Sequence, residues 1–195
     1  MRKSRQYNSY KGKVGTVAKN PLNRRFHTTI PLQKLVTDVT KFKCTGEGKL
    51  YLSPIIDLYN GEVIAYGMNK LPTLDFVMKP LQEAVGIIRQ HGTVRTTLHS
   101  DQGWHYQHKQ YRRMLVEKGI KQSMSRKGNC YDNSVMENFF GHLKSELLYL
   151  QEFDSIEHFK AELIDYIDYY NNRRIKARLK GLPPALHRQQ ALLAA

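Results

Sequence analysis

The patterned part of the chain opens with three short runs of apolar and β-branched residues. The first covers about 35–42, the second 50–59 and the third 63–68. Asn60-Gly61 separates the second run from the third, and this pair is the strongest short signal for a β-hairpin turn. The pattern therefore predicts a three-stranded antiparallel meander. Residues 1–30, which precede it, have no sustained apolar period and indicate an extended, mobile arm.

Helical spacing replaces this alternation after Pro72. Apolar residues recur at helical intervals from Leu74 to Ile88, and Gly92 ends the predicted helix. A strand over 94–98, a helix over 107–118 and a strand over 120–124 follow. This order predicts an α/β fold with a mixed five-stranded sheet and helices on both faces. The first strand would be central, between the second and the fourth.

Two longer helices are predicted in the last third of the chain. The first runs from about Asp132 to Tyr149, and its core face carries Met136, Phe139, Leu143 and Leu147. The second opens at a capping-box pattern over 154–157. We expect three parts: a basic N-terminal arm over 1–30, a core over 31–150, and a C-terminal helix with a basic tail, packed on that core, over 151–195.

Charge is concentrated at the two ends of the chain. The formal net charge is +14; residues 1–30 hold eight Lys or Arg and residues 169–195 hold six, with no Asp or Glu in either range. The two ends therefore account for the whole excess. Basic ends on a neutral core favour a nucleic-acid partner, because Lys and Arg gain affinity by releasing phosphate counterions. The alternative is that the ends only improve solubility.

The cysteine content and the hydropathy of the chain bear on its cellular location. Two cysteines, Cys44 and Cys130, have no metal-like spacing, which indicates reduced thiols and a cytoplasmic protein. Together with the eight His they make no zinc pattern. No apolar signal segment follows the basic start, and no apolar run is long enough to span a membrane.

Three acidic residues form a candidate active site. Asp38 interrupts one apolar strand, Asp101 directly follows another, and Glu137 lies early on the next predicted helix. If the two strands are parallel neighbours, both aspartates lie at one end of the sheet, where such sheets bind ligands. Carboxylates this close repel one another unless a hard divalent cation such as Mg²⁺ lies between them. Three carboxylates can hold two ions, an arrangement suited to phosphodiester chemistry.

Each acid also has a simpler interpretation. Asp38 is explained as a buried, hydrogen-bonded carboxylate, and Asp101 as a turn residue. Glu137 is explained as the far half of a Ser-x-x-Glu capping box begun by Ser134. The joint order of the three, with thirty-five residues between Asp101 and Glu137, favours the catalytic interpretation.

Longer stretches around these acids resemble one family. They are His99-Ser100-Asp101-Gln102-Gly103, the run Ser123 to Asn133, the Glu137 helix, and Tyr169-Tyr170-Asn171-Asn172-Arg173-Arg174. From about Leu22 to Pro184 the chain resembles insertion-sequence transposases with a retroviral-integrase-type catalytic core, the product of the second of two overlapping reading frames. Leu35 stands in a region where many relatives have Trp, and Ser134 replaces the usual Ala. Relatives also carry a helix-turn-helix-like region before the core, whereas this chain begins in the basic segment that follows it.

The resemblance implies a ribonuclease-H-like fold with an integrase-type catalytic core over 31–150. It implies DNA strand cleavage followed by strand transfer, without a covalent protein–DNA intermediate. Asp38 would bridge two Mg²⁺ or Mn²⁺ ions, and Asp101 and Glu137 would each hold one. The implied partners are insertion-sequence ends and target DNA, with a homo-oligomer assembled on DNA. The implied place is a bacterial cytoplasm, at the nucleoid when DNA is bound.

Seven residues are candidate DNA contacts: Arg126, Lys127, Asn129, Asn133, Lys144, Arg173 and Arg174. The first three belong to a basic loop that we expect to order on DNA. Asn133 and Lys144 share one helix stripe with Glu137, although Lys144 is equally explained as a solvated lysine. The last two belong to the basic C-terminal end.

Two further residues, and the function of the chain as a whole, each have alternative interpretations. His99 is explained as packed or as a partner of the acids, and Trp104 as a core residue or a platform for a flipped base. A ribonuclease-H-type nuclease would only hydrolyse. A truncated transposase would act as a DNA-binding regulator.

Overall fold

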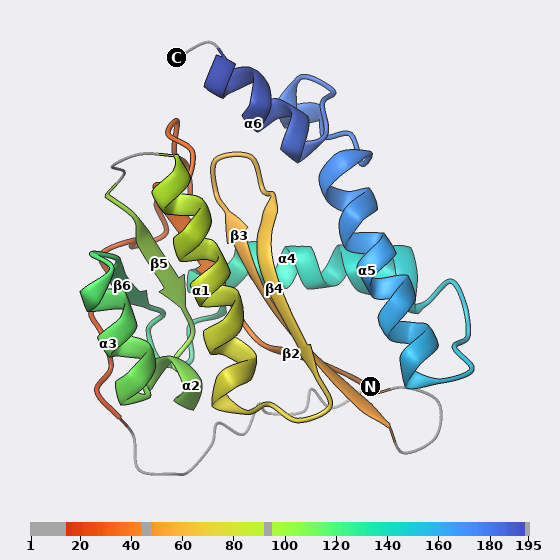
Figure 1. Cartoon of the computed structure of the whole chain (residues 1–195), viewed down its shortest axis with the longest axis horizontal. Coiled ribbons are helices and arrows are strands. Elements are labelled where there is room, and N and C mark those ends of the chain that lie inside the picture. The colour runs from red at the N-terminus through yellow and green to blue at the C-terminus, as the bar shows by residue number, and fades with distance from the viewer. Residues whose placement is uncertain (1–14, 44–47, 92–94, 194–195) are drawn as a thin grey trace.

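The computed structural model describes residues 15–43, 48–91 and 95–193. Its centre is a mixed sheet in the order β4-β3-β1-β5-β6, with β2 beside β3 (Figure 1). The strands are β1 Lys34–Thr37, β2 Thr40–Lys43, β3 Lys49–Asp57, β4 Val63–Asn69, β5 Thr97–Ser100 and β6 Lys121–Met124. β1 lies between antiparallel β3 and parallel β5, which confirms the predicted central position of the first strand.

The first predicted strand is interrupted at Asp38 and Val39, so the sheet has six named strands where five were expected. β1 and β2 pair with β3 in one continuous register and are two halves of one strand. That register places Asp38 opposite Pro54, which has no backbone N–H to donate to a neighbour. The interruption frees the backbone around Asp38 from the ladder at this point.

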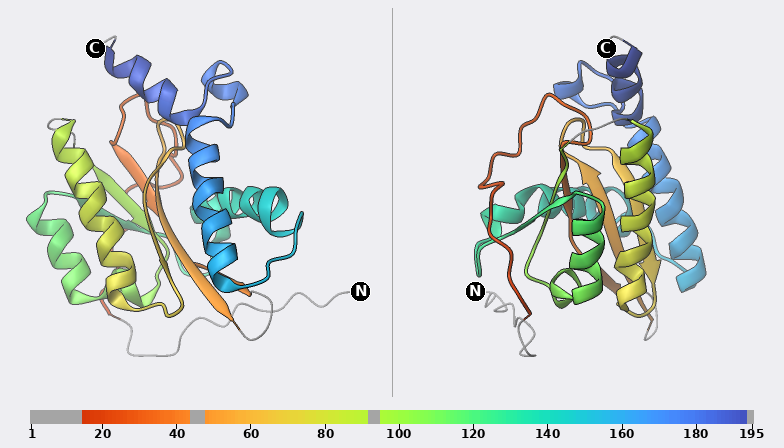
Figure 2. Two further views of the ribbon diagram at one scale, coloured as in Figure 1. Left: turned by 45° about the vertical axis from the view of Figure 1, so that its right-hand side comes forward. Right: turned by 60° about the vertical axis from the view of Figure 1, so that its left-hand side comes forward.

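Helices cover both faces of the sheet, as predicted. α1 Leu74–Gln90 and α3 Lys109–Glu117 lie on one face, and α4 Ser134–Leu143 lies on the other (Figures 1 and 2). Neighbouring strand residues point to opposite sides, so Leu35 joins the core under α1 while Val36 joins the core under α4. α5 Ile156–Asn172 packs beside β3 and β4 and shares the second of these cores.

The long helix expected over 132–149 has three parts. A 3-10 turn, η1 Cys130–Asn133, precedes α4, and a π-helical turn, η2 Lys144–Leu148, follows it. The predicted core face is confirmed, because Met136, Phe139, Leu143 and Leu147 are all buried. α5 begins one residue later than the capping pattern suggested: its N-cap is Ser155, whose hydroxyl accepts from the His158 N–H at 3.0 Å.

Both ends of the described chain are packed on the domain. Residues 15–30 contain no helix or strand, yet Leu22 is buried and its N–H donates to Ser123 Oγ at 3.4 Å. The expected mobile arm is therefore not free over this stretch, and residues 1–14 lie outside the described residues. The basic tail folds into η3 Ala177–Leu179 and α6 Pro184–Leu193, which lie near the β3–β4 turn (Figure 1). Within the described ranges, no helix is long and apolar enough to cross a membrane.

Candidate active site at the carboxyl end of the central strands

Asp38 and Asp101 follow neighbouring parallel strands. Continuing the β1–β5 register, in which Val36 pairs with His99, places Asp38 directly opposite Asp101. Adjacent strands lie roughly 4.8 Å apart, and residues in register on parallel strands face the same side. The two carboxylates therefore meet at one end of the sheet, as the sequence predicted.

Asp38 is held by two hydrogen bonds, and no Lys or Arg among the described residues forms an ion pair with it. Its Oδ1 accepts from the Val39 N–H at 2.7 Å, and its Oδ2 accepts from Asn133 Nδ2 at 2.7 Å. Burial, then the charge of Asp101 and, least, that of Glu137 together raise the pKa of Asp38 to about 7, against the two hydrogen bonds, which lower it. The site thus concentrates negative charge that the protein itself leaves uncompensated.

Asp101 is fixed by the turn that follows β5. Its Oδ1 accepts from the Gly103 N–H at 2.8 Å, and burial raises its pKa. A Cβ at Gly103 would lie 2.9 Å from that same oxygen, so any side chain there would push the Asp101 carboxylate out of this position. Tyr106 packs beneath, with its hydroxyl 3.4 Å from Thr37 Oγ1; burial and both aspartates raise the pKa of this tyrosine.

Glu137 stands in the first turn of α4 with its side chain exposed. The N-cap of α4 is Asn133, and it makes no side-chain cap hydrogen bond; Ser134 is already inside the helix. The capping-box interpretation of Glu137 is therefore wrong. Its carboxylate is near enough to raise the pKa of Asp38. In this structure, however, the described residues contain no group of three His, Cys, Asp or Glu placed closely enough to hold a metal ion.

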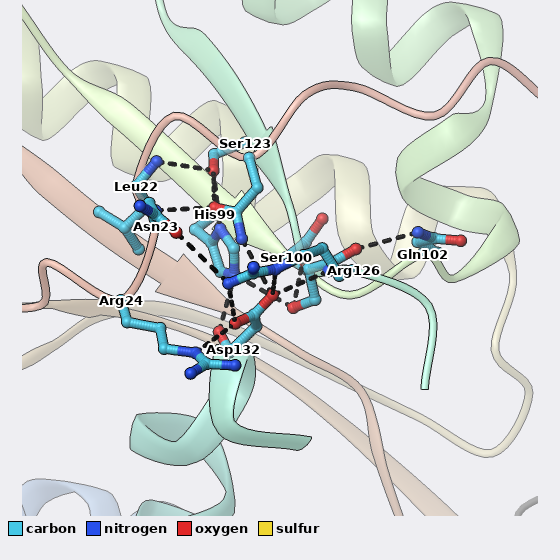
Figure 3. Close-up of polar contacts among 11 residues, drawn as sticks. Leu22, Asn23, Arg24, His99, Ser100, Gln102, Ser123, Arg126 and Asp132 are labelled. Atoms are coloured by element: carbon cyan, nitrogen blue, oxygen red, sulfur yellow. Dashed lines mark hydrogen bonds and ion pairs between the residues drawn. The ribbon is translucent and has the colours of Figure 1, made fainter. Parts of the chain in front are cut away.

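A fourth carboxylate, Asp132, organises the loop before α4 (Figure 3). Its side chain is fully buried and accepts from Arg126 Nε at 2.9 Å and from Arg24 Nε at 2.8 Å. Asn20 Nδ2 and the Arg126 N–H add bonds of 3.0 Å each. The hydrogen bonds from Arg126 are the main reason that the pKa of Asp132 lies well below its usual value. Beyond the Asp-Asn-Ser motif no sequence signal points to this cluster, because Arg24 and Asp132 are distant in the chain.

His99 links the same loop to the sheet through hydrogen bonds (Figure 3). Its Nδ1 is 2.8 Å from Ser123 Oγ, and its Nε2 is 2.9 Å from the Asp132 carbonyl oxygen. Burial lowers the pKa of His99, which favours the neutral ring. β5, β6 and η1 are thereby joined, and the start of α4 is set against Asp38 and Asp101.

The candidate DNA contacts are dispersed. Asn133 is bonded to Asp38, and Arg126 to Asp132. Lys127 is exposed in the loop, and the side-chain oxygen of the half-buried Asn129 has no hydrogen-bond partner among the described residues. Lys144 lies in the π-helical turn and is partly buried.

The two C-terminal arginines differ. Arg173 is exposed and pairs with Asp168 at 3.2 Å, whereas Arg174 is bound through two nitrogens to Glu146. Trp104, for which core packing was the favoured interpretation, is 39% exposed and stacks on His105 with ring centroids 3.9 Å apart. That expectation is wrong for Trp104, although its neighbour Tyr106 is a core residue.

A mixed sheet whose two central parallel strands end in aspartates, with a third acid on a helix packed against them, defines a catalytic core of the ribonuclease-H-like class. Comparison with known families agrees. The chain belongs to the integrase core domain family, which matches residues 28–130 and, in a second family description, residues 137–192. The first match contains Asp38 and Asp101, and the second begins at Glu137.

Relatives among curated proteins are transposases of bacterial insertion elements. The chain is 50% identical over 191 residues to "Putative transposase InsK for insertion sequence element IS150" of Escherichia coli (strain K12), covering 98% of this chain and 66% of the relative. It is 49% identical over 190 residues to an "Uncharacterized transposase-like protein" of Haemophilus influenzae, covering 97% and 86%. The chain thus spans just under two thirds of the length of the E. coli relative.

Solved structures show the fold. The catalytic core domain of HTLV-2 integrase, in complex with magnesium, superposes with a TM-score of 0.59 at 16% identity, covering 81% of this chain and 97% of that one. A chain of the simian T-cell lymphotropic virus intasome, bound to a PP2A regulatory subunit, gives a TM-score of 0.59 at 16% identity, with coverages of 89% and 56%. The ribonuclease-H-like fold predicted from the sequence is confirmed.

Proposed function

We propose that the chain is the catalytic core of an insertion-sequence transposase that cleaves DNA strands and transfers them to target DNA. The observation that carries this proposal is the pair formed by Asp38 and Asp101 in register on parallel strands, with Glu137 near enough to add to their repulsion. Transposase relatives at half identity support the same reaction.

The site residues fit divalent metal. Their donor set is carboxylate oxygen alone, which suits Mg²⁺ or Mn²⁺. Burial and the negative charge of Asp101 raise the pKa of Asp38, and a bound cation would offset both effects. We propose two ions, with Asp38 shared and with Asp101 and Glu137 holding one each. Bound there, the ions would activate the attacking oxygen and stabilise the leaving oxygen of a phosphodiester. Magnesium in the HTLV-2 integrase core supports this assignment.

The remaining residues would position these ligands. Asn133 orients the Asp38 carboxylate, and the Gly103 N–H orients that of Asp101. The Asp132 cluster holds the start of the Glu137 helix. Glu137 itself stands in solvent, so we propose that it moves onto the metals when DNA and ions bind.

The proposal also includes DNA contacts at the seven candidate residues. It further includes a homo-oligomer assembled on DNA, in a bacterial cytoplasm. Lys127 and Lys144 are the best suited to phosphate, since among the described residues no carboxylate lies within 4.0 Å of either. Arg126 and Arg174 would first have to leave Asp132 and Glu146.

Single-turnover strand transfer with pre-cut element ends and Mg²⁺ tests the proposal. Glu137→Gln should lower the rate by about 10³-fold or more, because a metal ligand loses its charge while metal supplies several kcal/mol of transition-state stabilisation. Its melting temperature in chelator should hardly change, since the side chain is exposed. Glu83→Gln, an exposed acid on α1, is the matched control and should keep the wild-type rate.

Three outcomes separate the candidate functions. Joined DNA products identify a transposase, and hydrolysis without joining identifies a nuclease. Binding without either reaction identifies a regulator. A Glu137→Gln protein that joins DNA at the wild-type rate would remove Glu137 from the site.

A further inference from the structure

A cluster of cationic side chains lies at the β3–β4 turn, at the other end of the sheet from the acids. The turn contains Asn60 and Gly61, and Gly61 adopts a φ of +75°, a conformation that favours glycine. Asp57, at the end of β3, pairs with Leu35 near the start of β1, whereas Asp38 follows the end of β1. η3 and α6 lie over this turn (Figure 1).

Two cationic groups converge on Gly61. An added Cβ there would lie 2.6 Å from Arg178 Nη2 and 2.9 Å from Lys176 Nζ, so the two nitrogens lie within about 5.5 Å of each other. Any side chain at position 61 would displace one of them. The glycine thus makes the turn and also leaves room for the two cations to meet.

Lys176 is held in place rather than free to swing. Its Nζ donates to the Gly61 carbonyl oxygen at 3.2 Å and to the Tyr170 hydroxyl at 2.8 Å, and it lies 4.0 Å from the centre of the Tyr170 ring. Burial, and then the charges of Arg178 and Arg174, lower the pKa of Lys176 to about 7. The repulsion between these cations is what an anion bound between them would relieve.

The nearby carboxylates are already engaged by other arginines. Glu146 binds Arg174, and the buried Glu62 binds Arg188 at 2.8 Å. Within the described residues, no carboxylate lies within 4.0 Å of Lys176 Nζ or of the Arg178 guanidinium. Positive charge is therefore left over at this turn.

Unused hydrogen-bonding capacity surrounds the same turn. His187 Nδ1 and Arg188 Nη1 are buried and have no hydrogen-bond partner in the part of the chain that the structure describes. The ring of His187 packs against Tyr59 at 5.2 Å, next to the turn, and Arg178 and Lys180 both help to lower its pKa. His187 and Arg188 both belong to α6, the helix that lies near this turn.

We propose that Lys176 and Arg178 form a binding site for a backbone phosphate of DNA, separate from the cleavage site. Charge-assisted bonds to phosphate oxygens are about 2.7–2.9 Å long, so one phosphate spans two nitrogens at this separation. The proposal rests on the proposed function for the identity of the anion. DNA bound here would be held at the opposite end of the sheet from Asp38 and Asp101, which gives the core a second anchor for one duplex.

The experiment measures DNA affinity in chelator, where the metal ligands play no part. Fluorescence anisotropy of the full chain with a labelled element-end duplex gives Kd over a range of salt concentrations. Arg178→Gln is the test variant, because its side chain is exposed and its loss should spare the fold. We expect a Kd about tenfold weaker and a salt slope smaller by about 0.9, the effect of one lost phosphate contact.

Control variants distinguish a specific phosphate site from a general effect of lost positive charge. The wild-type measurement distinguishes failure of this site from failure of the proposed function. Arg113→Gln removes the same charge from the exposed face of α3 and should leave the salt slope unchanged. A second variant, Lys176→Gln, should repeat the loss, with a melting curve to verify folding. Equal slopes for Arg178→Gln and wild type would overturn the phosphate site. Failure of the wild type to bind any DNA would instead overturn the proposed function.

Discussion

Two carboxylate clusters, one half-buried and one buried, lie within one loop of each other and differ in how their charge is compensated. At the carboxyl ends of β1 and β5, Asp38 and Asp101 face each other with no ion-pair partner in the part of the chain that the structure describes, and the pKa of Asp38 rises to about 7. Behind the loop, Asp132 is enclosed by Arg24 and Arg126, and its pKa falls. Among the described residues, arginines compensate the acid that holds the loop, whereas no cation compensates the acids that we propose as metal ligands.

The largest expected effect comes from removing charge at the uncompensated cluster. Asp38→Asn should lower strand transfer by about 10³-fold or more, because both proposed ions lose their shared ligand. In chelator at about pH 8 the same variant should melt a few degrees higher, since a charged carboxylate is no longer buried there and its repulsion with Asp101 disappears. Differential scanning calorimetry and the strand-transfer assay measure the two halves of this prediction.

The changes in activity and in stability should have opposite signs. A lower melting temperature for Asp38→Asn would mean that the protein compensates Asp38 after all. The amide oxygen of the substituted side chain can still accept a hydrogen bond from Asn133, so the neighbouring helix keeps its contact. Glu83→Gln again serves as the control for a lost negative charge on an exposed surface.

Neutralising the acid of the Asp132 cluster should lower the stability of the protein, whereas neutralising Asp38 should raise it. Asp132→Asn removes the partner of two arginines that are each about half exposed, so the cost is roughly 1–3 kcal/mol rather than that of a fully buried pair. For a chain of this size we expect the melting temperature to fall by about 5 °C.

The matched control is Asp168→Asn, which breaks the surface pair with Arg173, where both side chains are more than half exposed. Exposed pairs contribute little, so its melting temperature should move by less than about 2 °C. If both variants lose the same stability, the Asp132 cluster is no more than another surface salt bridge.

The sequence predicted the cluster of Asp38 and Asp101 but not the cluster around Asp132. Asp38 stood out because an acid inside an apolar strand breaks the local pattern, and Asp101 because it follows a short apolar strand. The order of strands then brought them together, as the structure confirms. Asp132 is more deeply buried, but two of its partners, Arg24 and Asn20, lie more than a hundred positions away in the chain. No periodicity links such residues.

Smaller differences have the same origin. The break in the first strand depends on Pro54 in a neighbouring strand, which local propensity cannot reveal. The apolar stripe of the Glu137 helix predicted its buried face but not its 3-10 start or its π-helical end, because all three geometries present similar side chains inward. Packing of residues 15–30 follows from isolated contacts such as that of Leu22 with Ser123.

The smallest expected effect is a difference in how stability depends on pH. A carboxyl whose folded pKa is raised keeps its proton in the folded state between about pH 4 and 7, whereas the unfolded chain has lost it. Rising pH across this window therefore lowers the contribution of Asp38 to stability. Asp132, with a lowered folded pKa, is ionised in both states there and contributes no slope; its contribution is lost only below about pH 4.

Melting temperatures in chelator between about pH 5 and 8, measured for wild type and Asp38→Asn, isolate this contribution. Asp57, whose pKa burial raises to about 6, and His99, whose pKa burial lowers, also titrate, but both remain in the two proteins and cancel in the difference. The wild type should lose a few degrees relative to the variant as pH rises. Saturating Mg²⁺ should flatten that loss, because a bound cation favours the ionised carboxylates. A difference that stays constant with pH, with or without Mg²⁺, would show that the repulsion at the site has no energetic consequence and would remove the physical basis for a metal there.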